Sequence, residues 1–305
     1  MAITYPATNV ADVLTADEVQ LLLQNPGLIA RRVAELAKDR FIADFLLSGR
    51  FEAKGGVILY EENFIPEADR DPESIAPNGE YPLTTMTAPE VEAAKVKKWG
   101  EDGIVTDESI ARNGNRPLDT KLMGIVNKLV RWIDGVAMSV IGSRVTEAFD
   151  ATQTPWTGDT AGQNLLTSVL TAQAEAIQKT DGMYDYNTVV LSPKQQSVAS
   201  IYMLGSRINA GQPAAGADLF RDLGFEYVVY SPAVTDPMIV DRNRLGGMAD
   251  ENLGGPGYSK VNGMLIETKV MRLDETDAWR PRARRVTVPV VTDPMAAIKI
   301  QNVGV

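Results

Sequence analysis

The chain has 305 residues, a net charge of −10, no cysteine and no histidine. The missing cysteines exclude disulfides, cysteine-ligated metals and cysteine nucleophiles, and the missing histidines remove the commonest general base and metal ligand. The sequence contains no run of about 18 apolar residues, which a membrane span would need. It also contains no basic start followed by an apolar stretch, which is typical of a signal peptide.

The first fifty residues predict a tail followed by short helices. Residues 1–16 have no clear pattern, whereas apolar residues recur at helical spacing from Leu21 to Phe45. Asn25-Pro26-Gly27 interrupts that pattern and divides it into two helices, because proline and glycine disfavour the middle of a helix. Ser48-Gly49 ends the region.

Residues 55–103 predict an extended, charged hairpin with no core of its own. Val57–Tyr60 is a β-prone run, and Val91–Val105 is the expected return strand. Pro77-Asn78-Gly79 is a turn signal between them. A two-stranded hairpin is marginally stable by itself in water, so it must pack either on its own domain or on another subunit.

Residues 118–149 predict one long, unbroken helix. Thr106 is expected to cap a short helix before it, and Pro117 suits its first position. Apolar residues recur at intervals of three and four in a wide stripe, which indicates a helix packed on two sides. Its expected length is about 48 Å. Three glycines along it, Gly124, Gly135 and Gly142, suggest close packing or a gentle bend.

The second half predicts an inserted α/β lobe and then closing strands. Asp150–Gln163 is the expected linker. The predicted elements of the lobe are a helix over Asn164–Gln178, a buried strand over Thr188–Leu191, a capping box over Ser192–Gln195, a short helix over Ala217–Gly224, and strands over Tyr227–Tyr230 and Met238–Val240. The closing strands, expected beside the long helix in the first lobe, are Met264–Met271, Arg284–Val291 and Ala297–Gln301.

Motifs for catalysis or cofactor binding are missing from the sequence. There is no phosphate-binding Gly-x-x-x-x-Gly-Lys-Ser/Thr loop and no Gly-x-Ser-x-Gly nucleophile elbow. The glycine clusters Gly246-Gly247 and Gly254-Gly255-Pro256-Gly257 lack dinucleotide-binding spacing and are expected to be flexible loops. We therefore expect no enzyme activity, no cofactor and no metal.

Two charged segments are candidate contact surfaces between subunits. The acidic turn of the hairpin contains Glu67, Asp69, Arg70, Asp71 and Glu73. In the basic run 280–285, an extended backbone places Arg280, Arg282 and Arg284 on one face. These arginines could contact nucleic acid phosphates or the acidic turn of another copy, and the acidic charge of the chain favours the second. A plain solvated face remains a third interpretation.

The order of these pieces resembles the major capsid proteins of tailed double-stranded DNA phages, which have the Hong Kong 97-type fold. The resemblance covers nearly the whole chain. The segments that carry it are Ala68-Asp69-Arg70-Asp71-Pro72, Thr106-Asp107-Glu108-Ser109-Ile110, Thr188-Val189-Val190-Leu191-Ser192-Pro193 and Val240-Asp241-Arg242-Asn243-Arg244-Leu245-Gly246-Gly247. It implies an α+β fold in four parts. These are an N-terminal arm (1–50), an E-loop (51–105), a peripheral domain with a spine helix (106–155 and 262–305) and an axial domain (156–261).

The resemblance also implies a structural role. Copies of the chain would form pentamers and hexamers that tile an icosahedral or prolate head around double-stranded DNA, held without sequence specificity. Expected partners are other copies, a portal protein and a separate scaffolding protein, because only about 50 residues precede the loop. The expected location is the virion capsid, and the host cytoplasm during assembly, with no membrane contact.

Three other interpretations stay open. An encapsulin-type nanocompartment shell shares this architecture and would enclose a cargo enzyme. An enzyme built on the α/β lobe would need a pocket with converging carboxylates and Lys or Tyr. A soluble adhesin or tail component would lack a long helix beneath a hairpin.

Overall fold

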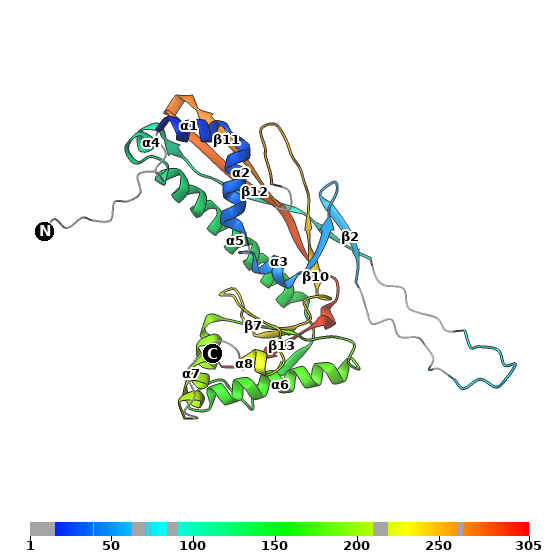
Figure 1. Cartoon of the computed structure of the whole chain (residues 1–305). Helices are drawn as coiled ribbons and strands as arrows, with labels where there is room; N and C mark the ends of the chain where they lie inside the picture. Colours follow the sequence, from blue (N-terminus) through cyan, green and yellow to red (C-terminus); the bar gives the residue numbers. More distant parts are fainter. Residues whose placement is uncertain are drawn as a thin grey trace.

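The computed structural model describes residues 16–38, 40–62, 71, 73–83, 91–209, 219–261 and 265–304. The helices are α1 (Ala16–Gln24), α2 (Pro26–Ala37), α3 (Ile42–Leu46), α4 (Asp107–Asn113), α5 (Arg116–Arg144), α6 (Ala161–Lys179), α7 (Pro193–Asn209) and α8 (Leu219–Asp222). The strands are β1 (Gly49–Glu52), β2 (Val57–Glu61), β3 (Val91–Lys95), β4 (Lys97–Asp102), β5 (Val105–Thr106), β6 (Ala148–Asp150), β7 (Thr188–Leu191), β8 (Tyr227–Tyr230), β9 (Met238–Val240), β10 (Gly246–Asp250), β11 (Ile266–Leu273), β12 (Ala278–Val291) and β13 (Ala297–Gln301). Figure 1 shows an elongated body along α5, a second lobe around α6 and α7, and, far from both, the described segment 73–83, which is the tip of the arm between β2 and β3.

Helix α5 forms the axis of the body. Its buried side chains are Leu118, Leu122, Ile125, Val126, Leu129, Ile133, Asp134, Ala137, Met138 and Ile141. The predicted long helix is confirmed, but its predicted end at Phe149 is wrong. The helix ends at Arg144, Val145 turns into the core, and β6 then pairs in parallel with β13. A partner strand about 150 residues further along the chain therefore sets this boundary.

The larger sheet has six strands centred on β12. The order is β1-β10-β12-β11, and β4 and β5 also pair with β12. The return strand predicted over Val91–Val105 is wrong as a single element. Only β3 stays in the hairpin, since the chain turns inward at the buried Val96 and continues as β4 along β12.

The hairpin β2–β3 is a separate two-stranded sheet with two unlike faces. Its inner face packs on a small apolar cluster that is separate from the main core. Ala53, Val96 and the β12 residue Val286 form this cluster, with Ile58 packed against them. Its outer face carries Val57, Leu59 and Val91, which are 41%, 70% and 64% exposed. The predicted hairpin is therefore confirmed. Its inner face packs on its own domain, which was one of the two predicted alternatives, whereas its outer face lacks a core within the described residues.

The second lobe contains the five-stranded sheet β6-β13-β9-β7-β8 with α6 packed against it. The buried strand β7 is confirmed, and so is the capping box: Ser192 N donates to Gln195 Oε1 at 2.8 Å. The expected return of Ala297–Gln301 to the body is wrong, because this strand is β13 of the second lobe. Conversely, β10 falls within the predicted axial domain (156–261) but pairs with β1 and β12 of the body. The expectation of a flexible loop at Gly246-Gly247 is wrong, because both glycines are buried in β10, where a bulkier residue would collide with β12 or β1.

One continuous cluster of buried apolar side chains runs through both lobes. The predicted linker contributes to it, because Trp156 is 1% exposed and donates from Nε1 to Ser168 Oγ at 3.3 Å. Phe45 of α3 also packs edge-on against Tyr227 of β8, with 5.2 Å between the ring centroids. The two lobes therefore share a core, whereas the hairpin stands outside it.

Candidate assembly surfaces

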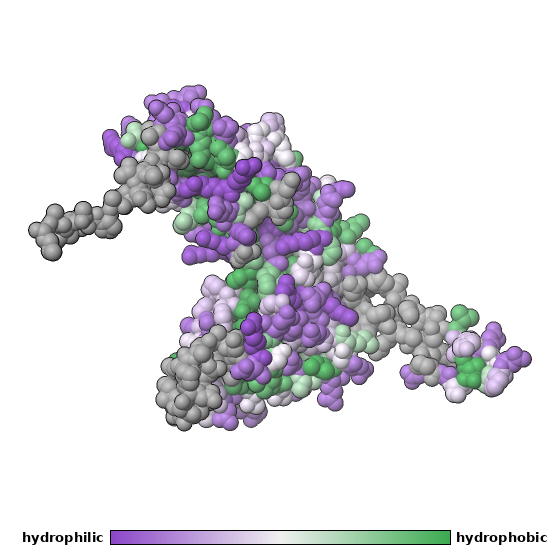
Figure 2. All heavy atoms as spheres, viewed as in Figure 1, coloured by the Kyte–Doolittle hydropathy of each residue, from purple (hydrophilic) through white to green (hydrophobic). Residues whose placement is uncertain are grey.

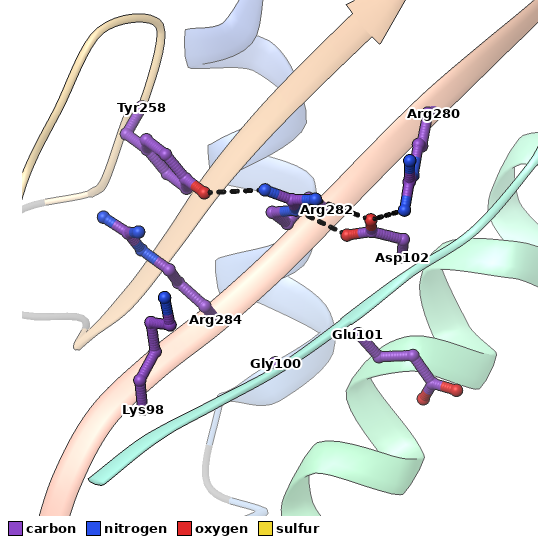
Figure 3. A pocket seen from close by; sticks show the side chains of 8 residues that line it. All are labelled: Lys98, Gly100, Glu101, Asp102, Tyr258, Arg280, Arg282 and Arg284. Atoms are coloured by element: carbon purple, nitrogen blue, oxygen red, sulfur yellow. Dashed lines mark hydrogen bonds and ion pairs between the residues drawn. The ribbon is translucent and has the colours of Figure 1, made fainter.

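Strand β12 presents a row of arginines above a groove in the body. The predicted shared face is confirmed, because Arg280, Arg282 and Arg284 all line this groove, and the neighbouring strand β4 supplies its other wall. Gly100 lies opposite Arg284, and a Cβ on it would come within 2.8 Å of the Arg284 Cβ. The groove has a volume of about 520 Å³ and is lined by Lys98, Gly100, Glu101, Asp102, Tyr258, Arg280, Arg282 and Arg284 (Figure 3).

The arginines are held by carboxylates of their own chain. Arg282 donates to both oxygens of Asp102, at 2.6 and 2.7 Å, and Arg280 reaches the same carboxylate at 2.5 Å. These bonds, above all those from Arg282, hold the pKa of Asp102 below its ordinary value. Arg284 pairs with Glu267 at 2.6 Å. The row is therefore pre-oriented, with Asp102 as the only lining carboxylate that faces the arginines.

The remaining charges leave the groove basic. Figure 3 shows Glu101 pointing away from the arginines, and this side chain binds Lys128 of α5 at 2.6 Å. Lys98 is exposed and has no ion pair with any described residue. Sequence patterns alone did not single out Lys98, although its alternation with Gly100 and Asp102 in an exposed strand is a usable signal.

A glycine-rich loop closes one side of the groove. The Arg284 guanidinium lies 3.6 Å from the centroid of the Tyr258 ring, and Arg282 donates to the Tyr258 hydroxyl at 3.3 Å. Gly254 donates to Glu267 at 2.8 Å and accepts from Arg284 at 2.5 Å. The predicted loop over Gly254–Gly257 is confirmed, and cation–π and hydrogen-bond contacts hold it on the sheet.

The acidic turn of the hairpin is only partly described. Glu67, Asp69 and Arg70 lie outside the described residues. Asp71 and Glu73 are exposed, and neither lines the arginine groove of its own chain. Their role as contacts between subunits stays a prediction.

The inner face of the hairpin is tied to the end of α5. Arg144 donates to Glu92 from both terminal nitrogens, at 2.9 Å in the longer contact, and Tyr60 donates to Glu92 at 2.7 Å. The bonds from Arg144 and Tyr60 lower the pKa of Glu92, and burial with the bond to Glu92 raises the pKa of Tyr60 to about 12. This polar contact fixes the hairpin root and leaves the apolar outer face exposed. Figure 2 shows further hydrophobic side chains at the far end of the arm, in the described segment 73–83.

A buried ionic cluster attaches α3 to the large sheet of the body. Arg285 is 1% exposed and donates in bidentate fashion to Asp44 of α3, at 2.8 and 2.7 Å, and to Asp250 of β10, at 2.9 and 3.1 Å. Asp44 also accepts from Arg50 of β1 at 2.6 Å. Despite burial, the bonds from Arg285 and Arg50 lower the pKa of Asp44. In the sequence Arg285 is only one member of the basic run 280–285.

Asp134 of α5 is a second buried carboxylate beside this cluster. It is 6% exposed and accepts from the backbone N–H of Ala43 at 2.9 Å, so it holds the start of α3. Burial raises the pKa of Asp134, the hydrogen bond from Ala43 lowers it by less, and the net value is about 6. Asp134 and Arg285 together attach α3 to the body.

The described residues were also compared with what a metal site and a membrane-spanning helix would need. Among these residues no group of three acidic side chains is arranged to hold a metal ion. No helix in the same part of the chain is long and apolar enough to cross a bilayer.

Comparisons with solved structures identify the fold. A phage-related protein from Bordetella bronchiseptica RB50 matches with a TM-score of 0.58 at 11% identity, over 91% of this chain and 97% of that one. A virus-like particle from Pyrococcus furiosus matches with a TM-score of 0.56 at 9% identity, over 90% and 97% of the two chains. The capsid of cyanophage P-SCSP1u matches with a TM-score of 0.55 at 14% identity, over 84% and 86%. The expected Hong Kong 97-type fold is confirmed.

Sequence comparison identifies the family. No curated protein sequence matches the chain. A family model described as phage capsid protein matches residues 89–300, which is well over half of the chain. This match favours a phage capsid over the encapsulin-type alternative. The chain therefore belongs to the phage capsid protein family.

Proposed function

We propose that the chain is the major capsid subunit of a tailed double-stranded DNA phage, and that its copies close into a shell of pentamers and hexamers. The family match and the fold support a capsid role. The observation that carries the proposal is the hairpin β2–β3, whose outer face exposes Val57, Leu59 and Val91. Apolar residues in alternate positions of a strand normally face a core, and a second copy can supply one.

The charged segments fit the same arrangement. From residue 61 to residue 80 the arm contains seven acidic residues and one arginine. The groove along β12 is basic and carries the exposed Lys98. We infer that the acidic turn, including Glu67, Asp69, Asp71 and Glu73, lies over the arginine groove of an adjacent copy. Because Asp102 and Glu267 already hold the arginines, incoming carboxylates would bind the remaining donors and Lys98.

Each such contact is weak when solvent-exposed, at about 0–1 kcal/mol. A closed shell multiplies these contacts, because each one formed makes the next effectively intramolecular. The proposed further partners are a portal protein, a separate scaffolding protein and the enclosed DNA. The proposed role is structural, without enzyme activity, in the virion capsid and in the host cytoplasm during assembly.

Negative-stain electron microscopy of the purified full chain, alone and with a scaffolding protein, tests this function. Closed shells or rings of five and six subunits are the expected result. A stable monomer under both conditions would contradict it.

A charge exchange tests the proposed contact. Asp71→Lys and Lys98→Glu should each reduce the yield of shells, because each places like charges at the contact, and the double variant should restore it. Neither side chain has an ion pair with a described residue of its own chain, so the folds should survive. Lys194→Glu, at an exposed position of α7, is the matched control. Additive losses in the double variant would show that the two side chains do not meet.

A further inference from the structure

The solvent-facing side of α5 is basic. Arg116, Lys121, Lys128 and Arg131 are all exposed there. At 3.6 residues per turn the four Cα positions fall within an arc of about 140°, and between the first and the last of them the helix advances about 22 Å. They therefore form one basic face along the helix, which we call the α5 face.

These cations are largely unneutralised. Lys128 pairs with Glu101, but Arg116, Lys121 and Arg131 form no ion pair with any described residue. Arg40 adds a further cation at the edge of the face, where it donates to the neutral Asn127 at 2.7 Å. A chain with a net charge of −10 thus concentrates free positive charge along one helix.

One end of the α5 face is concave. A recess of about 450 Å³ lies between α4, the start of α5 and the segment before β5. Arg116 and Lys121 line it together with the polar side chains of Asn113 and Thr120, the capping side chains of Thr106 and Ser109, and the apolar Ile104, Val105 and Pro117. The two cations, with the Asn113 amide and the Thr120 hydroxyl beside them, are the groups of this recess that can bind a phosphate.

The α5 face carries little side-chain bulk at two glycines. Gly124 lies between the cations and Gly135 lies one turn beyond Arg131, both within the same arc, and nothing lies within 4 Å of where their Cβ atoms would stand. Glycine is less favourable than alanine inside a helix, and packing among the described residues does not offset that cost. The low bulk at these two positions allows a ligand backbone to approach the helix closely.

We propose that the α5 face is the surface that contacts the packaged double-stranded DNA, through its phosphates and without base readout. The inference rests on the proposed function, because only a shell around DNA presents the same face of every copy to a duplex. Phosphates of one strand are spaced about 3.4 Å apart along the axis, so ~22 Å of helix faces about six of them. A protein partner would call for an apolar centre, and the exposed large apolar side chains of α5 are Met123 and Trp132 alone.

Binding of a short, random-sequence duplex to the dispersed full chain tests the proposal. Fluorescence anisotropy would be measured between about 50 and 200 mM salt. The variant Lys121→Gln/Arg131→Gln removes two cations of the α5 face, and Lys194→Gln/Lys260→Gln removes two exposed lysines elsewhere as a charge-matched control. Each lost phosphate contact reduces the magnitude of the negative slope of log affinity against log salt by about 0.9. The slope of the first variant should therefore be smaller in magnitude than that of the wild type by about 1.8. The control should keep the wild-type slope.

Electron microscopy of the same preparations separates the two proposals. Shells from all three chains, with equal DNA slopes, would overturn the DNA inference and leave the capsid function intact. No shells from any chain would overturn the capsid function. A peptide of residues 61–80 that binds the wild type but not Lys121→Gln/Arg131→Gln, when the duplex binds neither, would assign the α5 face to the acidic arm instead. Closed shells should not bind added duplex, and shells that bind it as well as dispersed chains would contradict an inward-facing α5.

Discussion

The body around α5 and the hairpin β2–β3 contain similar residues but are stabilised differently. In the body, apolar side chains of α5 and the sheets are buried, and the buried Arg285 is paired with Asp44 and Asp250. In the hairpin, strand residues with equal β propensity leave Leu59 70% exposed. The body is thus complete as a single chain, whereas the hairpin needs a surface that the described residues do not supply.

This contrast explains which features could be predicted from the sequence. The helical period predicted α5, and the strand period predicted the shared face of Arg280, Arg282 and Arg284, because both patterns are local. The end of α5 was not predictable in this way, because β6 depends on a distant partner strand.

The buried position of Arg285 could not be predicted from local sequence patterns either. It follows the groove arginines directly, but its side chain points to the opposite face of β12, where Asp44 lies 241 positions away in the sequence. A run of arginines predicts solvent-exposed side chains, so only the tertiary fold identifies Arg285 as part of the core.

The strongest test of the body is removal of the buried cation. Arg285→Ala leaves Asp44 and Asp250 without their main partner in a buried site, so the free energy of unfolding should fall by about 3–5 kcal/mol. Urea unfolding would measure it. Arg50→Ala, which removes an exposed partner of the same Asp44, is the matched control and should cost about 1 kcal/mol or less. Equal losses would mean that Arg285 does not lock α3 to the sheet.

Asp134 gives the body a defined pH dependence. Its folded pKa of about 6 exceeds the ordinary 3.8, so the folded state binds the proton more tightly than the unfolded state. This carboxyl therefore lowers stability as pH rises from about 4 through about 6. Asp134→Asn keeps an acceptor for Ala43 N–H and should raise the free energy of unfolding at neutral pH by about 1–3 kcal/mol, with the gain vanishing below pH ~4. Parallel stability curves for the two proteins across this range would refute the assignment.

A substitution at the hairpin root should lower the free energy of unfolding far less than one in the body. Tyr60→Phe removes one hydrogen bond to Glu92 at a half-buried position, while Arg144 remains bound to that carboxylate. The loss in the global free energy of unfolding should be about 1 kcal/mol or less. Hydrogen exchange of β2 and β3 should report the local loosening, with unchanged exchange in α5. A loss as large as that of Arg285→Ala would place the hairpin within the cooperative core.

The outer face of the hairpin tests the central claim most directly. Leu59→Asp changes a side chain that is largely exposed in the single chain, so the free energy of unfolding should change by about 0.5 kcal/mol or less. Shell formation, counted by electron microscopy under conditions in which the wild type closes into shells, should be lost, because a charge would be buried against a neighbouring copy. Lys194→Asp, at an exposed position away from the hairpin, should assemble normally. Wild-type shell yield from a folded Leu59→Asp chain would contradict the claim that this face finds its core on a second copy.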